Sequence, residues 1–370
     1  MKIVISREEL KRAINIVKGI ISSKVSFPIL SNVLMEAENN LLKFSATDLR
    51  MSIEYTVDCN VEVAGALTLS GQRLSLLLNE LPDADVTLEL LENGIVELRC
   101  GGVETKLFSM YAEEFPPINK FDDVEPIMLR QAQLKKQFQK TSFAISTDQS
   151  RHNLTGLLLE ARQGELRAVA TDSRRLSLAV STETLSTDQE IKVIIPSKMV
   201  HELQTLLSDD PEKMVDVFLA QSQACFKFDN ICIITALIEG GFPNYDAVIP
   251  KSMENEIILE LSPFIQLVRR ATAMTNDRFK NARFTFEPGL IQVYVKTPEV
   301  GEYEEELAAE YSGNSFSISF NPFFLLDVLR FIETERVCML MKDGGSPALI
   351  KPFTEAPVDT YVNVIMPIRN

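Results

Sequence analysis

The stretch Leu166–Val180, LRAVATDSRRLSLAV, has two strand-like apolar runs on either side of the polar turn Thr171-Asp172-Ser173-Arg174-Arg175. A related stretch, LLKFSATDLRMSIEYTV at Leu41–Val57, carries the turn Thr47-Asp48-Leu49-Arg50. Asp suits such turns because its side chain accepts hydrogen bonds from nearby backbone N–H groups. The two stretches therefore predict the same hairpin in successive parts of the chain, with Asp48 and Asp172 as turn residues.

These hairpins belong to a larger repeated unit of helix, strands, helix and strands. The first repeat begins with a helix near Arg7, whose apolar residues have helical spacing. These residues are Leu10, Ala13, Ile14, Val17 and Ile21. Its second helix has Ser70 as N-cap, and Asn93-Gly94 forms a later hairpin turn. The order recurs near Arg130 and again from Leu259. We therefore predict three domains, at 1–125, 126–252 and 253–370.

The composition limits the class of protein. The chain has 370 residues, 45% of them hydrophobic, and a net charge of −15, which alone argues against nucleic acid as a partner. The five cysteines lack Cys-x-x-Cys spacing, so we interpret them as buried residues in a reducing cytoplasm. The N-terminal apolar run is too short for a signal peptide, and no apolar run approaches bilayer length. We expect a cytoplasmic protein.

Positive charge gathers at the first predicted helix of each repeat. Residues 7–24, 130–140 and 266–280 carry net charges of +3, +4 and +3, so the rest of the chain carries −25. Arg7, Lys11 and Lys18 share the helix face opposite the apolar residues. Three such helices along an arc would form a basic strip, with the acidic sheets outside. This arrangement suits contacts with a phosphate backbone that do not read the bases.

Motifs for catalysis are missing from the sequence. There is no phosphate-binding glycine loop, no Gly-x-Ser-x-Gly, no His-Glu-x-x-His and no EF-hand loop. The only histidines are His152 and His201, and a carboxylate pair would require Asp48 and Asp172 to meet. We predict no catalytic residue, no cofactor and no metal site. Two alternatives remain open: a scaffold that binds only proteins, and an enzyme that uses these two aspartates.

Six motifs follow one another along the chain. They are FPILSNVL (Phe27–Leu34), SATDLRMS (Ser45–Ser52), NLTGLLLE (Asn153–Glu160), VATDSRRLSLA (Val169–Ala179), GGFPNYDAVIP (Gly240–Pro250) and MPIR (Met366–Arg369). Each motif alone is weak, but their order, combined with three repeats at this length, is specific. Over its whole length the chain resembles the bacterial β sliding clamp, the DNA polymerase III subunit beta.

The resemblance implies an α+β fold with three domains of the DNA-clamp type, helices on the inner face and sheets outside. It implies a ring made by a head-to-tail homodimer that encircles double-stranded DNA without sequence specificity. Such a ring gives processivity to the replicative DNA polymerase. Partners would be that polymerase, the clamp loader, other polymerases and repair proteins, all docking through short linear motifs in a groove between domains two and three. No membrane is implied.

The resemblance also assigns site residues, supplemented by the charged residues of the repeated helices. The expected DNA-facing residues are Lys11, Lys18, Lys24, Arg73, Lys136, Lys140, Gln149, Arg151, His152, Asn153 and Arg269. The expected groove residues are Leu154, Thr171, Ser173, Arg174, Arg175, Leu176, Pro243, Val248, Gly345, Val364, Met366, Pro367, Ile368 and Arg369. The expected dimer contacts are Thr105, Leu107, Ala273 and Met274.

Within the groove, the apolar residues would accept Leu or Phe anchors, while Arg175 would serve a partner's polar groups and pack its stem on them. From the residues alone, Leu154, Leu176 and Val364 are read as plain sheet core, and the resemblance reverses that reading. The chain departs from the family at two places: Arg174 stands where members usually have His, and no Arg lies near Ala247. We therefore expect Arg174 to meet the anionic end of a partner peptide. Asp148 weakens the expected attraction of its loop for phosphate.

Overall fold

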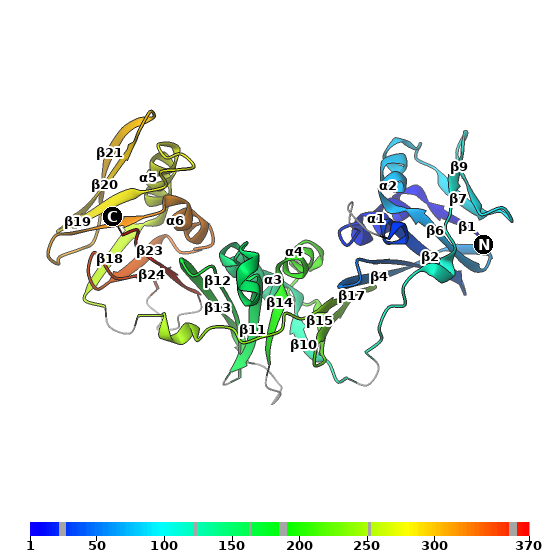
Figure 1. Ribbon diagram of the computed structural model, residues 1–370, viewed down its shortest axis with the longest axis horizontal. Coiled ribbons are helices and arrows are strands. Elements are labelled where there is room, and N and C mark those ends of the chain that lie inside the picture. Colours follow the sequence, from blue (N-terminus) through cyan, green and yellow to red (C-terminus); the bar gives the residue numbers. More distant parts are fainter. Residues whose placement is uncertain are drawn as a thin grey trace. The chain divides into compact units, whose positions relative to one another are not determined.

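The computed structural model describes residues 1–21, 27–121, 124–162, 164–184, 191–250, 253–354 and 361–369 (Figure 1). These residues form two compact units. Unit 1 comprises Met1–Ala132 and Thr205–Leu237, and unit 2 comprises Gln133–Gln204 and Ile238–Asn370. Within the described part of the chain, no helix combines the length and the apolar character needed to span a bilayer.

Unit 1 contains two antiparallel sheets. The first has the strand order β5 (Asn60–Val63), β1 (Lys2–Ser6), β7 (Asp85–Leu90), β8 (Ile95–Cys100) and β9 (Val103–Phe108). The second has the order β10 (Ile127–Arg130), β15 (Met214–Leu219), β16 (Gln223–Phe228), β17 (Ile231–Ala236), β4 (Met51–Asp58), β3 (Leu41–Thr47), β2 (Asn32–Glu38) and β6 (Gly65–Ser70). Strand β9 therefore lies at a sheet edge.

Unit 2 also contains two antiparallel sheets. The larger has the order β14 (Lys192–Pro196), β11 (Gly156–Arg162), β12 (Glu165–Thr171), β13 (Arg175–Thr184), β25 (Tyr361–Ile365), β24 (Ala348–Pro352), β23 (Arg336–Met341) and β18 (Asn255–Glu260). The smaller has the order β21 (Gly301–Ala308), β20 (Leu290–Thr297), β19 (Ala282–Glu287) and β22 (Phe316–Phe320). Strand β21 is the edge of this smaller sheet.

Both eight-stranded sheets join strands from two neighbouring sequence repeats. In unit 1, β4 of the first repeat pairs with β17 of the second, with Met51 opposite Thr235. In unit 2, β13 of the second repeat pairs with β25 of the third, with Arg175 opposite Ile365. In each case the third strand after a repeat's first helix pairs with the last strand of the next repeat. The middle repeat therefore contributes strands to both units.

Two α-helices accompany each repeat, as the sequence pattern predicts. They are α1 (Arg7–Val17), α2 (Gly71–Glu80), α3 (Gln131–Thr141), α4 (Ser197–Leu206), α5 (Leu261–Ala273) and α6 (Pro322–Leu329). Short 3-10 turns are η1 (Pro28–Ser31), η2 (Ala112–Glu114), η3 (Ser142–Ala144), η4 (Gln149–Leu154) and η5 (Tyr245–Ala247). The predicted cap Ser70 is confirmed, since its side chain accepts from the backbone N–H of Arg73. Asn321 caps α6 by accepting from the backbone N–H of Phe323.

The apolar spacing decides which faces are buried. In α1 the buried residues are Leu10, Ala13, Ile14 and Val17, as predicted. The helix ends at Val17, earlier than the basic segment 7–24, whose Lys24 lies outside the described residues. In β4 the residues Met51, Ile53, Tyr55 and Val57 are buried while their neighbours are not, which is the alternation of a sheet with one covered face.

All five cysteines are free, and four are buried. The structure thus agrees with their interpretation as buried thiols. Cys232 is half-buried, and its Sγ lies 3.5 Å from Sγ of Cys225 on the neighbouring strand.

Candidate peptide groove and DNA-facing surface

The Thr-Asp turns of the first and second repeats, at Thr47–Arg50 and Thr171–Arg175, have the same hydrogen bonds. Asp48 Oδ1 accepts from the backbone N–H groups of Arg50 and Met51, at 3.0 and 2.7 Å. Asp172 Oδ1 accepts from those of Arg174 and Arg175, at 2.9 and 3.0 Å. The turn chemistry predicted for these aspartates is confirmed, and it gives each of them a structural role.

Unit 2 has a largely apolar cavity of about 240 Å³ beside the second turn. Its lining includes eight of the predicted groove residues together with Tyr245. These residues are Thr171, Ser173, Arg175, Leu176, Pro243, Tyr245, Val248, Val364 and Met366. Val248 and Met366 are exposed, whereas Leu176 and Val364 are buried in the sheet. The cavity therefore has an apolar floor and accessible apolar walls.

The floor of the cavity rests on a buried cluster of the β13–β25 sheet. Leu158, Leu176, Leu178, Tyr245 and Val364 all belong to this cluster. Leu176 and Val364 are opposite each other in the pairing of β13 with β25. The two readings of these residues, as sheet core and as groove lining, are thus both compatible with their positions.

Six predicted groove residues do not line the cavity, namely Leu154, Arg174, Gly345, Pro367, Ile368 and Arg369. Leu154 is buried, and Gly345, Arg174 and Arg369 are exposed. The backbone of Arg174 accepts from the N–H of Met366 at 2.9 Å, so this arginine adjoins the cavity wall. Within the described part of the chain, its guanidinium has no hydrogen-bond or ion-pair partner.

Tyr245 is the lining residue that the sequence reasoning missed. Its hydroxyl donates to Glu160 Oε2 at 2.5 Å, and its ring is buried beneath the cavity. Burial, together with the bond to Glu160, raises the pKa of the Tyr245 hydroxyl. The signal was present in the motif FPNYDAV, since Tyr245 lies between the predicted groove residues Pro243 and Val248.

Two residues of the predicted DNA-facing loop instead brace the groove. Arg151 Nη1 donates to Ser173 Oγ at 2.6 Å, and Ser173 lines the cavity. Asn153 Nδ2 donates to the carbonyl of Gly241 at 2.8 Å, close to Pro243 in the chain. Gln149 and His152 lie in the same 3-10 turn, η4, and are exposed. This turn therefore supports the cavity with at least two of its side chains.

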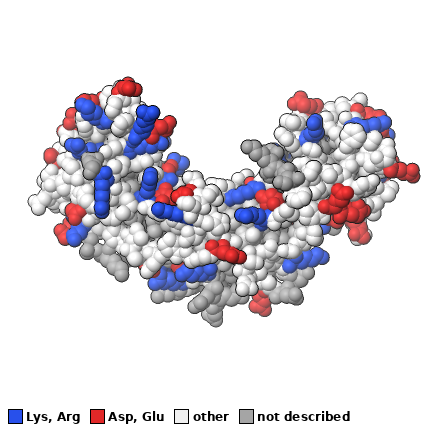
Figure 2. All heavy atoms as spheres, in the orientation of Figure 1, with Lys and Arg blue, Asp and Glu red and all other residues white. Residues whose placement is uncertain are grey.

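The expected DNA-facing cations differ in how available their charges are. In the described residues, Lys11, Lys18, Arg73 and Arg269 form no ion pair, and all but the half-buried Lys11 are exposed. Arg7, predicted on the face of Lys11 and Lys18, donates to the carbonyl of Leu81 at 2.9 Å. On the faces in Figure 2, Lys and Arg side chains form separate groups with Asp and Glu among them.

Lys136 and Lys140 share one acidic partner. Their Nζ atoms lie 2.8 and 3.5 Å from Glu333 Oε2. The side chain of Lys140 is only 14% exposed, and its Nζ lies 5.2 Å from the centre of the Tyr361 ring. Burial lowers the pKa of Lys140, although Glu333 acts in the opposite direction. The charge of Lys140 is therefore largely balanced by Glu333 within unit 2, which argues against the role at DNA expected for Lys140.

The expected dimer contacts lie on or beside two edge strands, β9 of unit 1 and β21 of unit 2. Thr105 and Leu107 belong to β9, whose residue Phe108 is 85% exposed. Ala273 and Met274 end α5, and a Cβ added at Gly301, the first residue of β21, would lie 3.4 Å from Met274 Cε. In each unit, therefore, these residues adjoin a strand with an unpaired backbone edge.

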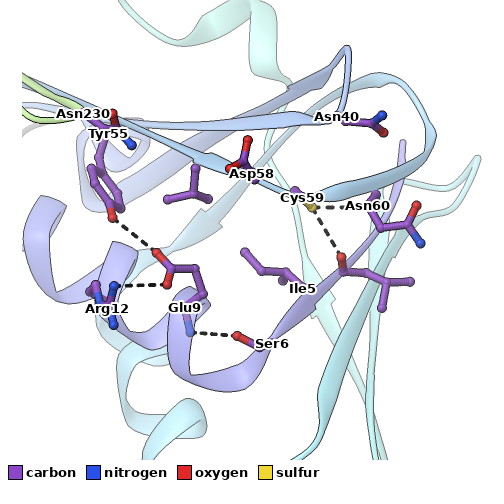
Figure 3. Close-up of a pocket in the computed structure, with 12 residues that line it drawn as sticks. Ile5, Ser6, Glu9, Arg12, Asn40, Tyr55, Asp58, Cys59, Asn60 and Asn230 are labelled. Atoms are coloured by element: carbon purple, nitrogen blue, oxygen red, sulfur yellow. Dashed lines mark hydrogen bonds and ion pairs between the residues drawn. The ribbon is translucent and has the colours of Figure 1, made fainter.

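A second, more polar cavity of about 660 Å³ lies in unit 1 between β1, α1 and the β4–β5 bend (Figure 3). Glu9 lies on its wall, where it accepts from the Tyr55 hydroxyl at 3.2 Å and pairs with Arg12 at 3.3 Å. Burial raises the pKa of the nearby Cys59 thiol to about 11. None of the predicted site residues lines this cavity.

The described residues contain no group of three or more His, Cys, Asp or Glu side chains arranged to hold a metal ion.

Three family models match successive parts of the chain. The N-terminal, central and C-terminal domains of the DNA polymerase III beta subunit match residues 1–119, 128–244 and 246–369. The beta sliding clamps of Chlamydia muridarum and Pseudomonas putida are 32% and 30% identical to the chain. Both alignments cover the whole chain, with 99% and 100% of the relative.

Solved structures agree with the sequence comparison. A crystal structure of the DNA polymerase III subunit beta from Pseudomonas aeruginosa is similar with a TM-score of 0.93 at 29% identity, covering both chains completely. A sliding clamp from Bartonella birtlesii, solved bound to griselimycin, is similar with a TM-score of 0.94 at 30% identity, again over both whole chains. The chain belongs to the DNA polymerase III beta subunit family, the beta sliding clamps.

Proposed function

We propose that two copies of this chain close head to tail into a ring around duplex DNA and tether the replicative polymerase to it. The proposed domains are 1–125, 126–252 and 253–370. The family is a non-catalytic processivity factor for DNA polymerase III, and the hydrogen bonds of Asp48 and Asp172 within their turns fit the absence of chemistry. The buried free thiols and the replication role support a cytoplasmic location.

One observation carries the ring: the rule by which neighbouring repeats pair. The third strand after a repeat's first helix pairs with the last strand of the next repeat, as in β4 with β17 and β13 with β25. Among the described strands, β21 of the third repeat and β9 of the first, which the same rule would pair, each have one unpaired edge. Pairing β21 with β9 of a second copy continues the rule, and a head-to-tail interface of this kind closes into a ring.

The free edge of β9 has the surface of an interface. Edge strands with unpaired backbone groups invite pairing, and proteins usually protect them. Here Phe108 is 85% exposed, and Val103 and nearby Tyr111 are also exposed. Large apolar side chains on an open strand edge mark a surface that another chain covers. Thr105 and Leu107 on β9, with Ala273 and Met274 beside β21, are the proposed contacts.

Cysteine cross-linking tests this interface. If β21 pairs with β9 in the register of β13 with β25, Gly301 opposes Phe108 and Glu304 opposes Thr105. The variant with both Thr105→Cys and Glu304→Cys should give a covalent dimer on mild oxidation, joined at both interfaces. As matched control, Val63→Cys on β5, the other free edge of the same sheet, replaces Thr105→Cys and should give none. Equal cross-linking by both variants would contradict the proposed pairing.

We propose that DNA passes the helices without base recognition. Lys11, Lys18, Arg73 and Arg269 are the contacts we favour, because their charges have no acidic partner among the described residues. Lysine and arginine contacts to phosphate attract DNA regardless of sequence and let a protein slide. A closed ring needs only such weak contacts, since its topology prevents dissociation.

The cavity of unit 2 is the proposed docking site for linear peptides of polymerases, the clamp loader and repair proteins. Its apolar floor at Leu176 and Val364 suits Leu or Phe anchors, and Met366 offers an adaptable wall. A relative from Bartonella birtlesii was solved bound to griselimycin. Competition of griselimycin with a labelled Leu- and Phe-containing peptide tests the site. The variant Met366→Asp, changed at an exposed position of the cavity wall, should stay folded and bind both the peptide and griselimycin more weakly.

A further inference from the structure

Arg175 lies in the wall of the peptide cavity, but its guanidinium is occupied by the protein itself. Its Nε donates to Asp172 Oδ2 at 3.1 Å, Nη1 to Asp327 Oδ2 at 2.5 Å and Nη2 to the carbonyl of Phe143 at 2.6 Å. Its side chain is 11% exposed. All three nitrogens are therefore engaged by acceptors that come from three different places in the fold.

Aromatic rings enclose the same guanidinium. Its central carbon lies 4.4 Å from the Phe324 ring centre and 5.2 Å from that of Phe143. Phe143 in turn stacks on Phe331, with the ring centres 5.9 Å apart. Arginine suits such a site because its planar fork can hydrogen-bond in several directions while its faces stack on aromatic rings.

The partners of Arg175 belong to elements on both sides of the β13–β25 junction. Asp172 and Phe143 come from the second repeat, in the β12–β13 turn and η3, whereas Asp327 and Phe324 come from α6 of the third. The cavity lies along that junction, with Leu176 on one strand and Val364 on the other. One side chain thus fixes the turn, η3 and α6 against each other next to the cavity.

Charge balance separates the roles of the two adjacent arginines. Asp172 and Asp327 both contact Arg175, so a carboxylate of a bound peptide would find no net positive charge there. The neighbouring Arg174 is exposed, and within the described residues its guanidinium has no partner. An anionic group at the cavity mouth is therefore attracted by Arg174.

We propose that Arg175 is a positioning residue that sets the shape of the peptide groove without contacting the peptide's charge, while Arg174 selects peptides with an anionic end. This inference rests on the proposed peptide-docking function. It replaces the expectation that Arg175 serves the partner's polar groups, because those groups of Arg175 already have partners within the chain.

The test uses one fluorescein-labelled peptide ending in Leu-Phe, made with either a free C-terminal carboxylate or a C-terminal amide. Fluorescence anisotropy with the full chain gives Kd for both forms. Asp327→Asn should weaken both forms by the same factor, about tenfold, because the brace is loosened. Arg174→Ala should weaken only the carboxylate form, by about three- to tenfold.

Controls separate positioning from unfolding and from loss of any nearby charge. Asp327 also accepts from Arg330 at 2.6 Å, so Arg330→Gln is included and should leave both Kd values unchanged. Glu333→Gln removes another carboxylate of unit 2 that does not contact Arg175, and it should also have no effect. Arg175→Lys keeps the charge but not the fork, and should resemble Asp327→Asn. Thermal unfolding confirms that each variant is folded.

Two results would overturn the proposal. If Arg175 read the peptide's charge directly, Asp327→Asn would free the guanidinium and strengthen binding of the carboxylate form alone. If Asp327→Asn and Arg175→Lys, both folded, bound both forms like the unaltered chain, no positioning role would exist. Failure of the unaltered chain to bind either form would instead contradict the peptide-docking function itself, which distinguishes the two proposals.

Discussion

Single residues at the two Thr-Asp turns adopt a backbone conformation that most side chains avoid. Leu49 has φ 74° and Ser173, at the equivalent position, has φ 72°. For an L-residue this left-handed region costs about 1–2 kcal/mol, and Asn or Gly tolerates it best. The turns are held in this conformation by Thr and Asp side chains, which accept from the backbone N–H groups of the turn.

Leu49→Asn should stabilise the chain by about 0.5–1 kcal/mol, because Asn adopts this conformation with less strain. The leucine side chain is 59% exposed, so little buried apolar area is lost. Leu49→Val is the matched opposite, since a β-branched residue at positive φ is strongly disfavoured. In urea unfolding, Leu49→Asn should have a higher free energy of unfolding than the unaltered chain, and Leu49→Val a lower one. Equal stability of both would show that the turn is not strained.

Glu305 on β21 gives a prediction about acid. Arg270 donates to both its carboxylate oxygens, at 2.7 and 2.5 Å, and this hydrogen bonding lowers the pKa of Glu305. A carboxyl group whose folded pKa is lowered stabilises the fold above its unfolded pKa of about 4.3. That contribution is lost as the pH falls through the folded pKa.

Glu305→Gln should therefore lower the thermal stability at pH 7, and the difference from the unaltered chain should shrink steadily below about pH 4. Glu306→Gln is the control, because Glu306 forms no ion pair with any described residue. A difference that stayed constant down to pH 2 would contradict the ion pair as its source.

At the level of elements, our proposal assigns the assembly of the ring to the free edge of β9. Its residue Phe108 is 85% exposed, so the side chain buries little apolar area within unit 1. Phe108→Asp should leave the unfolding midpoint nearly unchanged while weakening self-association at least tenfold, as seen by sedimentation velocity over a dilution series. Leu76→Asp, at a 63% exposed position of α2, is the control and should associate normally. If Phe108→Asp dimerised as strongly as the unaltered chain, β9 would not be part of the interface.

The elements also show what sequence reasoning can and cannot reach. The cap Ser70 and the hydrogen bonds of Asp172 within its turn depend on neighbours in the chain and were predicted. Local patterns do not give long-range partners, so the partners of Arg175 and the sharing of Glu333 by Lys136 and Lys140 were missed. The joining of strands from two repeats into one sheet depends on such partners too.

The residues of the groove were likewise predictable from the sequence only in part. Eight of its lining residues followed from the family resemblance: seven lie in the six motifs, and Val364 lies two residues before MPIR. Tyr245 was missed, although it lies in one of those motifs, because its burial against Glu160 is a tertiary feature. Arg151 and Asn153 were assigned to DNA from their loop, but their hydrogen bonds to Ser173 and Gly241 appear only once the loops meet.

At the scale of the whole molecule, a few lysine and arginine contacts to phosphate should account for the salt dependence of the DNA affinity. Lys18→Gln should lower the slope of log affinity against log salt by up to about 0.9, the share of one phosphate contact. Lys140→Gln should change it less, because Lys140 is already paired with Glu333 and is 14% exposed. Fluorescence anisotropy with a labelled duplex, at salt concentrations from about 50 to 200 mM, measures the slope for both variants. A larger effect for Lys140 would reverse our assignment.

The central claim, that the chain acts as a closed ring, is tested most directly by how DNA topology affects retention. Labelled protein is loaded by the clamp loader on nicked circular duplex, isolated by gel filtration, and followed after a single restriction cut. We expect stable retention on the circle and rapid loss on the linear product, since the ring slides off free ends. Equally fast loss from the circular and the linear DNA would contradict the ring.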